Sequence, residues 1–473
     1  MVLQTTFAVF PLLLLLSPLI HPSSSSSLVS HYDLDWGSLR QPGLPRYSPR
    51  SSDAPTYKKR ESSSSSSSNS TITLEFTCTD PTDDTTTVLT SPLPFASYLP
   101  PSTASTCTRA HASFLRAITR IANIVHLRHS IHVKASFASF CEQQTSSLST
   151  AREKCRAEQG VLGSAGPAAW HEWNETTAEM LGTDHSYLYP SALARQYAPH
   201  AMQYQDYDIA ASFNSEPLWY FATSDSDDSD WDANHQWHLQ WSAKPNPPLK
   251  LRAVVYDFEQ IVLHELLHGL GFISSWYPWL DNTSILPAAP LVLTDGTIVG
   301  LTKPWLFNKW MAHVPTRTWM RQYQQQILTT SADIANGIFN GSLIFPFNTW
   351  TAAFKNTPAY TTALYLYTHA AINPGAVATY FPKLLPPPYH RTTSPLALHY
   401  AILYTPPEYS AGSTFSHLDS NTYRGTKQFL MRPFGTSGFG LDGMTPRGEP
   451  LGELVQGILG ALGYATSMFH VPG

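Results

Sequence analysis

Two stretches in the first third of the chain differ in how their apolar residues are spaced. Between positions 112 and 127 the apolar residues recur at helical spacing, which predicts an amphipathic helix. Between 131 and 140 apolar and polar residues alternate, as in a strand with one buried face. The stretch 208–221 also predicts a strand, with Ile209, Ala211 and Phe213 on one face. This mixture of helices and strands predicts an α+β fold.

The stretch 256–276 is different, because apolar residues cover almost every side of its predicted helix, which indicates a buried helix. The apolar residues in and just before it are Val254, Val255, Phe258, Ile261, Val262, Leu263, Leu266, Leu267 and Leu270. Between them stands the motif His264-Glu265-Leu266-Leu267-His268, followed by Gly269, Gly271 and Phe272. Polar side chains inside such a helix need partners, since burying them unpaired costs several kcal/mol.

A metal ion is the partner that this spacing favours. Residues four apart lie on one face of a helix, so His264 and His268 can bind a single ion, and zinc is the expected one. Glu265 then lies within reach of a water in the open position of the metal and can act as general base. The alternative is a structural cluster whose polar groups bond only to one another.

A catalytic zinc usually takes three protein side chains, so a third ligand is expected. No Glu occurs between His268 and Glu408, and the position six residues after His268 is Ser274, so two common arrangements have no candidate. The downstream residues that remain are Asp281, Asp295, Asp333, His313, His369, His390, His399, His417 and His470. His417 differs from the others in the sequence around it.

That surrounding sequence carries a family resemblance. Ser416-His417 is followed by Phe429-Leu430-Met431-Arg432-Pro433 and then by an apolar stretch, 451–464, that ends in Leu-Gly-Tyr. Together with HELLHGLGF, these features resemble the leishmanolysin-type branch of the metzincin metalloproteases, and even more its secreted bacterial and fungal relatives with an HELxHGLGF motif. The resemblance is specific over 256–276 and 415–464.

The resemblance implies a set of residues and a fold. It implies His264, His268 and His417 as zinc ligands, Glu265 as base, and Met431 as the residue of a Met-turn. The implied fold is α+β and metzincin-like: a twisted mixed sheet with a long metal-binding helix, a long insertion, and a C-terminal subdomain with the Met-turn and a closing helix. A substrate strand would pair with an exposed sheet edge, for which we expect the strand 208–221.

The roles of two tyrosines stay open, and the zymogen inhibition of the leishmanolysin type is not expected in this chain. Tyr423 and Tyr464 are candidates for stabilising the oxyanion, with a structural role as the alternative for each. The leishmanolysin type silences its zymogen with a propeptide cysteine, but this chain has no cysteine before Cys78, so that mechanism does not carry over.

The N-terminus predicts export. Phe7 to Ile20 is an apolar run of the length found in signal peptides, so 1–27 is predicted to be a signal peptide, with an uncleaved membrane anchor as the alternative. The Ser-rich segment 28–70 is too polar to form a core and is expected to be disordered. It contains Lys58-Lys59-Arg60, so it is either a propeptide to position 60 or a linker.

Cysteines and sequons fit the secretory route. Four cysteines in an exported chain predict two disulfides, and Cys78–Cys107 with Cys141–Cys155 is the simplest of three pairings. The candidate glycosylation sites are Asn69, Asn174, Asn282 and Asn340. The acidic loop 225–232 lacks a calcium-binding spacing and is expected to be solvated.

The chain carries few charged residues. Only 13% of residues are charged and the net charge is −5, so no nucleic-acid partner is indicated.

We divide the folded part into an N-terminal catalytic subdomain (71–276), an inserted subdomain (277–410) and a C-terminal catalytic subdomain (411–473). The expected function is a secreted zinc metalloendopeptidase with one Zn²⁺ and a polypeptide substrate. The alternatives are a non-catalytic secreted zinc protein that binds a partner, and a zinc hydrolase of non-peptide amides or esters.

Overall fold

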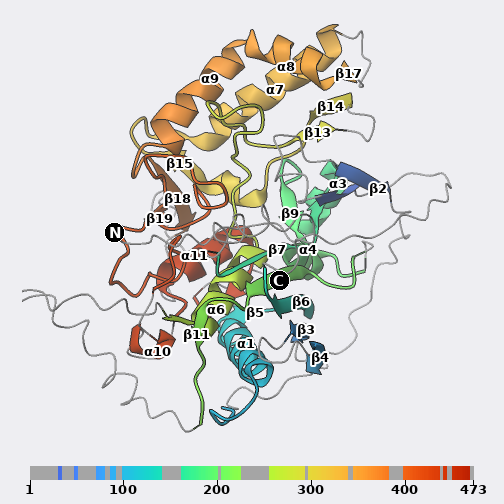
Figure 1. Ribbon diagram of the computed structural model, residues 1–473. Helices are drawn as coiled ribbons and strands as arrows, with labels where there is room; N and C mark the ends of the chain where they lie inside the picture. Colours follow the sequence, from blue (N-terminus) through green and yellow to red (C-terminus); the bar gives the residue numbers. More distant parts are fainter. Residues whose placement is uncertain are drawn as a thin grey trace, which may run out of the picture.

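The computed structural model describes thirteen segments of the chain. They are residues 30–34, 47–51, 71–79, 86–91, 99–140, 161–200, 204–224, 255–292, 297–338, 345–382, 398–436, 440–444 and 450–468. They form an α+β fold, as predicted (Figure 1). No helix among these residues is both long and apolar enough to cross a membrane. The signal peptide, the dibasic site, Cys141, Cys155, Asn69 and Asn340 lie outside the described residues.

Among the described residues the central sheet has five strands. In spatial order they are β4 (Thr86–Ser91), β3 (Ile72–Thr79), β6 (Ile131–Ala138), β10 (Ile209–Asn214) and β7 (Gly163–Pro167). The three middle strands are parallel, and the two edge strands run antiparallel to their neighbours. β6 confirms the predicted alternation, since its apolar positions are buried and the positions between them are not. The predicted strand 208–221 divides into β10 and β11 (Leu218–Tyr220).

Two long helices, α1 (Thr106–Ala122) and α6 (Phe258–Gly269), pack against each other and against this sheet. α1 confirms the helix predicted over 112–127, although it begins earlier and ends at Ala122, and the disulfide Cys78–Cys107 ties it to β3. Aromatic rings fill the space between helices and sheet, with Phe258 of α6 edge-on to Phe137 and Phe213. A buried ion-pair cluster also joins the helices, because Glu259 of α6 accepts from both Arg116 and Arg120 of α1 at 2.7 and 2.6 Å.

Smaller elements connect this layer to the rest. They are β5 (Val125–His126), β8 (Trp170–Glu172), α3 (Glu175–Leu181), β9 (Leu188–Pro190), α4 (Ser191–Tyr197) and β12 (Val255–Asp257), which pairs with β11. Two short strands, β1 (Ser30–Leu34) and β2 (Tyr47–Ser51), lie within the segment predicted to be disordered, and β1 pairs with β8. The other residues of that segment before position 71 lie outside the described residues.

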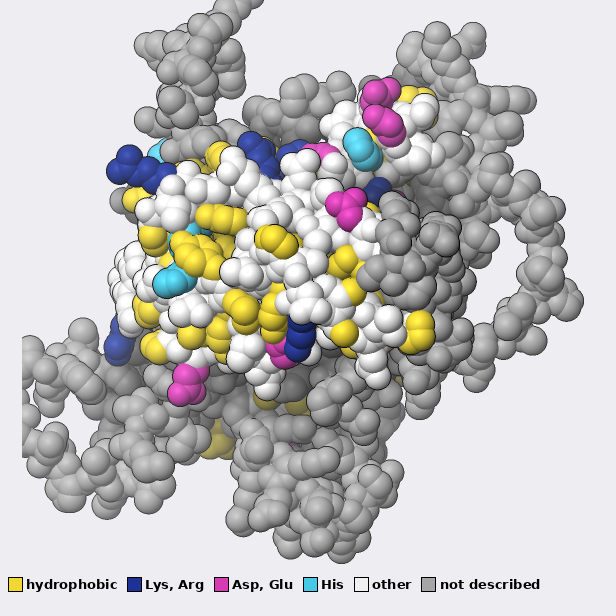
Figure 2. All heavy atoms as spheres, turned by 90° about the horizontal axis from the view of Figure 1, so that it is seen from above, with side chains coloured by type: hydrophobic (Ala, Val, Ile, Leu, Met, Phe, Trp, Pro, Cys, Tyr) yellow, Lys and Arg dark blue, Asp and Glu magenta, His cyan; other side chains and the backbone are white. Residues whose placement is uncertain are grey.

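The helices α7, α8 and α9 of the predicted inserted subdomain lie at one end of the molecule, and its strands β18 and β19 lie nearer to the C-terminal part (Figure 1). Its helices are η3 (Leu306–Trp310), α7 (Met320–Ile338), α8 (Phe347–Lys355), α9 (Pro358–Leu366) and the π-helical turn η4 (Tyr367–Ala371). Its strands are β13 (Pro290–Val292), β14 (Thr297–Leu301), β15 (Met311–His313), β16 (Thr318–Trp319), β17 (Phe345–Pro346), β18 (Val377–Pro382) and β19 (Leu398–Ile402). Its outer face is mostly uncharged, with hydrophobic side chains among polar ones (Figure 2).

The C-terminal part returns to the central layer. It contains α10 (Leu441–Met444), α11 (Glu453–Leu462) and β20 (Ala465–Thr466), which pairs with β5. α11 lies within the apolar stretch 451–464, and it ends at Gly463 in the left-handed conformation that favours glycine. α11 also contacts β18, so the inserted subdomain is in contact with the C-terminal part as well as with the residues that precede it.

Candidate metal centre

The helix that carries the motif is fixed at both ends. At its start the side chain of Asp257 accepts from the backbone N–H of Gln260 at 3.1 Å and from that of Leu441 at 2.6 Å. At its end Gly271 has a φ of 104°, which favours glycine, and a Cβ there would also lie 2.8 Å from the Pro190 ring. All twelve residues of α6 are buried, as the all-round apolar pattern predicted.

The structure brings His264, His268 and His417 together. The Nε2 atoms of His264 and His268 are 3.1 Å apart, those of His264 and His417 are 3.1 Å apart, and those of His268 and His417 are 3.2 Å apart. Each of the three side chains is fully buried. Two of them lie one turn apart on α6, while the third comes from a loop 149 residues further along the chain than His268.

Backbone carbonyls fix the protonation of all three rings. The Nδ1 of His264 donates to Leu430 O at 2.6 Å, that of His268 to Phe272 O at 2.7 Å, and that of His417 to Ser413 O at 3.1 Å. A carbonyl can only accept, so each Nδ1 carries the proton and each neutral ring presents an Nε2 lone pair. Three lone pairs therefore face one another, and they cannot hydrogen-bond to each other.

A metal ion fits this donor set. A tetrahedral ion with bonds of about 2.0–2.1 Å holds its nitrogen ligands roughly 3.3–3.4 Å apart, close to the spacing of the three Nε2 atoms. Burial lowers the pKa of all three imidazoles, most strongly for His264 and His417, where the neighbouring rings lower it further. The rings therefore stay neutral, which is the form that binds a metal.

Glu265 directly follows His264 on α6, and its side chain is fully buried. Among the described residues neither oxygen of this carboxylate has a well-formed hydrogen bond, and its polar neighbour is the backbone of Ala165. Burial raises the pKa of Glu265 to about 8, and the backbone of Ala165 in β7 opposes that shift. An unpaired buried carboxyl is rare in folded proteins, and it frequently marks a group that acts on a ligand.

The loop that carries His417 is held by backbone bonds from two sides. The His417 carbonyl accepts from the N–H of Tyr404 at 2.8 Å, and the next residue, Leu418, donates to Met431 O at 2.7 Å. Met431 is fully buried in a turn whose preceding carbonyl, that of Leu430, orients His264. The predicted Met-turn residue therefore belongs to the segment that supports two of the three histidines.

Several other predicted residues have structural roles. The hydroxyl of Tyr423 accepts from Ile402 N at 2.9 Å, and that of Tyr464 donates to Leu270 O at 3.0 Å, so both are engaged in the fold. Asp281 is paired with Lys355, and Asp333 is exposed on α7, while Asp295 lies outside the described residues. These residues are not part of the cluster that the three histidines form.

The expectation that the strand 208–221 offers a free sheet edge is wrong for β10, the longer of the two strands into which it divides. β10 lies between β6 and β7, so its backbone groups are already paired on both sides and it offers no free edge. The edge next to α6 is β7, whose sequence is Gly-Ser-Ala-Gly-Pro. The strand order could not be read from these small residues.

The remaining sequence predictions have mixed outcomes. The disulfide Cys78–Cys107 is present. Two sequons lie at exposed positions: Asn282, and Asn174, whose side chain also caps α3. Sequence reasoning missed Asn308, Ser275 and Ser416, which form a buried polar network beside the histidines.

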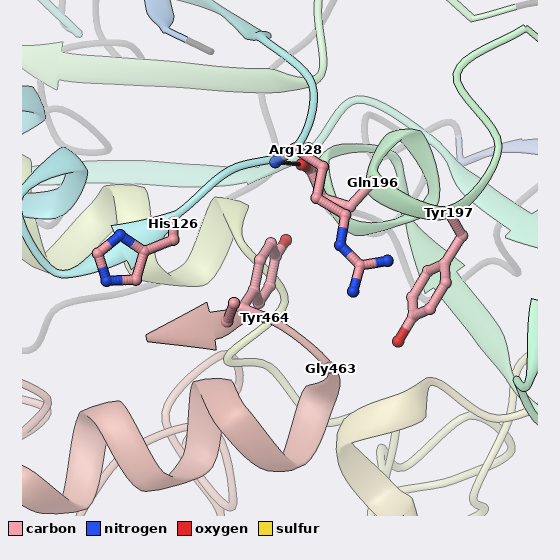
Figure 3. A pocket seen from close by; sticks show the side chains of 7 residues that line it. His126, Arg128, Gln196, Tyr197, Gly463 and Tyr464 are labelled. Atoms are coloured by element: carbon pink, nitrogen blue, oxygen red, sulfur yellow. Dashed lines mark hydrogen bonds between the residues drawn. The ribbon is translucent and has the colours of Figure 1, made fainter. Parts of the chain in front are cut away.

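A separate cavity lies near the C-terminal end of α11 (Figure 3). It is lined by His126, Arg128, Gln196, Tyr197, Gly463, Tyr464 and Ala465. Its volume is about 10 Å³, which is room for a single water. The Gln196 side chain, which borders it, already accepts from the backbone N–H of Arg128. This cavity provides no second candidate site.

One protein-family model matches nearly the whole folded part of the chain. Residues 50–236 and 228–471 match the model of a family described as SPBPB7E8-like. The chain belongs to the SPBPB7E8-like family. Both segments of that match contribute to the site, since β7 lies in the first and all three histidines lie in the second. Curated proteins and solved structures give no match.

Proposed function

We propose that this SPBPB7E8-like protein is a zinc metalloendopeptidase, built on the metzincin-like plan that its motifs resemble. The observation that carries the proposal is the triangle of three Nε2 atoms, 3.1–3.2 Å apart, with Glu265 next to it. A structural zinc normally takes four protein ligands, whereas a catalytic zinc takes three and leaves a position open. Among the described residues this cluster has three members.

The chain's own residues would divide the chemistry as follows. His264, His268 and His417 would hold the ion, which when bound polarises a carbonyl and lowers the pKa of a water to about 7. Glu265 would accept a proton from the attacking water and deliver it to the leaving amine. Burial raises the pKa of Glu265, and the positive charge of the bound ion would lower it again. The carboxyl would then ionise and could act as base.

The edge strand β7 supports a polypeptide substrate. An extended peptide can add to a free sheet edge through backbone hydrogen bonds, and among the described residues β7, beside α6, is paired on one side only. Ala165 of this strand lies close enough to Glu265 to influence its pKa, so a peptide on β7 would pass near the base. Because the histidines and Glu265 are fully buried, residues that cover them must move before a substrate enters.

The proposed setting is extracellular. A disulfide between Cys78 and Cys107 is stable in an oxidising compartment, which supports the predicted signal peptide.

The test is hydrolysis of unfolded proteins by the purified, zinc-loaded chain. Cleavage that stops with a chelator and returns with Zn²⁺ supports the proposal. A matched panel of small esters and non-peptide amides separates a peptidase from another zinc hydrolase. Zinc binding without hydrolysis of either panel would instead indicate a protein that keeps the metal for structure.

A further inference from the structure

Asn308 of η3 forms a fully buried amide bridge between the inserted subdomain and the residues that follow the metal-binding helix. Its Oδ1 accepts from Ser274 Oγ at 2.9 Å and from Ser275 N at 3.2 Å. Its Nδ2 donates to Ser275 Oγ at 2.8 Å and to Pro287 O at 3.3 Å. Two donors and two acceptors are thus all used, so the orientation of this amide is fixed.

The serines in this network are also fully engaged. The Ser275 hydroxyl donates to Pro287 O at 2.6 Å and accepts from Trp305 N at 3.0 Å. The Ser274 hydroxyl accepts from Trp276 N at 3.2 Å and uses its proton on Asn308. Asn308 therefore holds the backbone of residues 274–276 in one conformation.

That held segment supports two of the three histidines. Two residues before Ser274, the carbonyl of Phe272 orients the ring of His268. The N–H of Ser274 donates to Ser416 Oγ at 3.1 Å, and Ser416 immediately precedes His417. This bond joins residues 142 apart in sequence. A shift of residues 272–276 would therefore change the distance between His268 and His417.

We propose that Asn308 is a positioning residue of the metal centre, so that the inserted subdomain helps to set the affinity for the ion. This inference rests on the metal binding in the proposed function, but not on peptide hydrolysis. Groups that hydrogen-bond to the ligands typically contribute 10- to 100-fold to metal affinity, and the group that bonds to His268, the Phe272 carbonyl, lies just before the segment that Asn308 holds. Asn308 acts through the segment 274–276 and touches none of the three imidazoles.

The test compares Asn308→Leu with Ser284→Ala. Leucine keeps the volume of Asn308 but removes all four hydrogen bonds. Ser284 is equally buried in the inserted subdomain, and its hydroxyl bonds to Asp281 rather than to the network. Zinc affinity is measured by competition with a chromophoric chelator, and ligand geometry by the visible absorption of bound Co²⁺. Thermal unfolding of each metal-free variant reports stability separately.

We expect Asn308→Leu to weaken zinc binding about 10- to 100-fold and to change the Co²⁺ spectrum. Ser284→Ala is expected to change affinity less than about 3-fold even where it lowers the unfolding temperature. Ser416→Ala is a milder second variant, which removes the link from Ser274 and should weaken binding about 3- to 10-fold. It provides the test if the leucine variant does not fold.

An affinity and a Co²⁺ spectrum like those of the wild type in Asn308→Leu, or in Ser416→Ala where only that variant folds, would overturn the inference. A wild-type chain that binds no zinc would overturn it together with the proposed function. A wild-type chain that binds zinc but cleaves no peptide would refute only the proposed function, and the affinity ratios would still decide the role of Asn308.

Discussion

Replacing Glu265 by glutamine is expected to abolish hydrolysis while leaving the metal bound. Glutamine has the same shape, and neither carboxylate oxygen of Glu265 has a well-formed hydrogen bond among the described residues that the change would break. The variant should therefore fold and bind zinc within about 3-fold of the wild type. Loss of a general base costs about 10²- to 10⁴-fold in turnover, which corresponds to roughly 3–5 kcal/mol in activation free energy.

The assay is turnover of an unfolded protein substrate by the zinc-loaded variant, with metal content measured on the same sample. Glu259→Gln is the matched control, since it makes the same change on the same buried helix. It breaks the ion pairs with Arg116 and Arg120, so it should lower stability by about 3–5 kcal/mol but leave turnover per folded molecule within a few-fold. Wild-type turnover in Glu265→Gln would refute the assignment of the base.

Three further outcomes are expected. His417→Ala should weaken zinc binding by more than about 100-fold, because losing a metal ligand lowers the affinity more than losing a residue that bonds to a ligand. Chelator competition measures the affinity, and an unchanged value would mean that two imidazoles suffice to bind the ion. Replacing Cys78 and Cys107 by alanine should cost about 3.5 kcal/mol in urea unfolding, from a loop of 29 residues, and a loss near zero would contradict the loop-closure account. Burial, reinforced by Glu259, raises the pKa of Asp257 to about 7 from 3.8, so its contribution to stability is full below pH 3.8 and is lost as the pH rises toward 7. Wild-type stability should therefore fall by up to about 3 kcal/mol relative to Asp257→Asn between pH 5 and pH 8, and parallel pH profiles in urea unfolding would refute this.

Local periodicity predicted the elements that depend on local burial. α1 and β6 follow from apolar spacing because each buries the face that the spacing defines, and α6, which is apolar on almost every side, is buried all round. The single strand predicted over 208–221 breaks after Asn214, whose side chain accepts from Glu216 N in the turn before Pro217. Proline has no N–H for a sheet, so the strand cannot continue through it.

Long-range order was harder to predict. The pattern of β10 gave no sign that it would lie between β6 and β7, because strand order depends on pairing between distant segments. His417 was reached only through resemblance, since spacing alone left several downstream residues open. The three carbonyls that orient the histidines belong to Leu430, Phe272 and Ser413, and backbone groups leave no mark in a sequence pattern. Asn308 stands in no motif, so its role emerges only from its contacts.

Because His268 and His417 lie far apart in the sequence, a bound ion would also restrict the chain between them. An ion that joins them closes a loop of 149 residues, as a covalent cross-link would. By the chain-entropy relation used for disulfides, such a closure restricts the unfolded chain by about 5 kcal/mol. While the ion stays bound, the two ends of the inserted subdomain would be tethered to each other even in the unfolded chain.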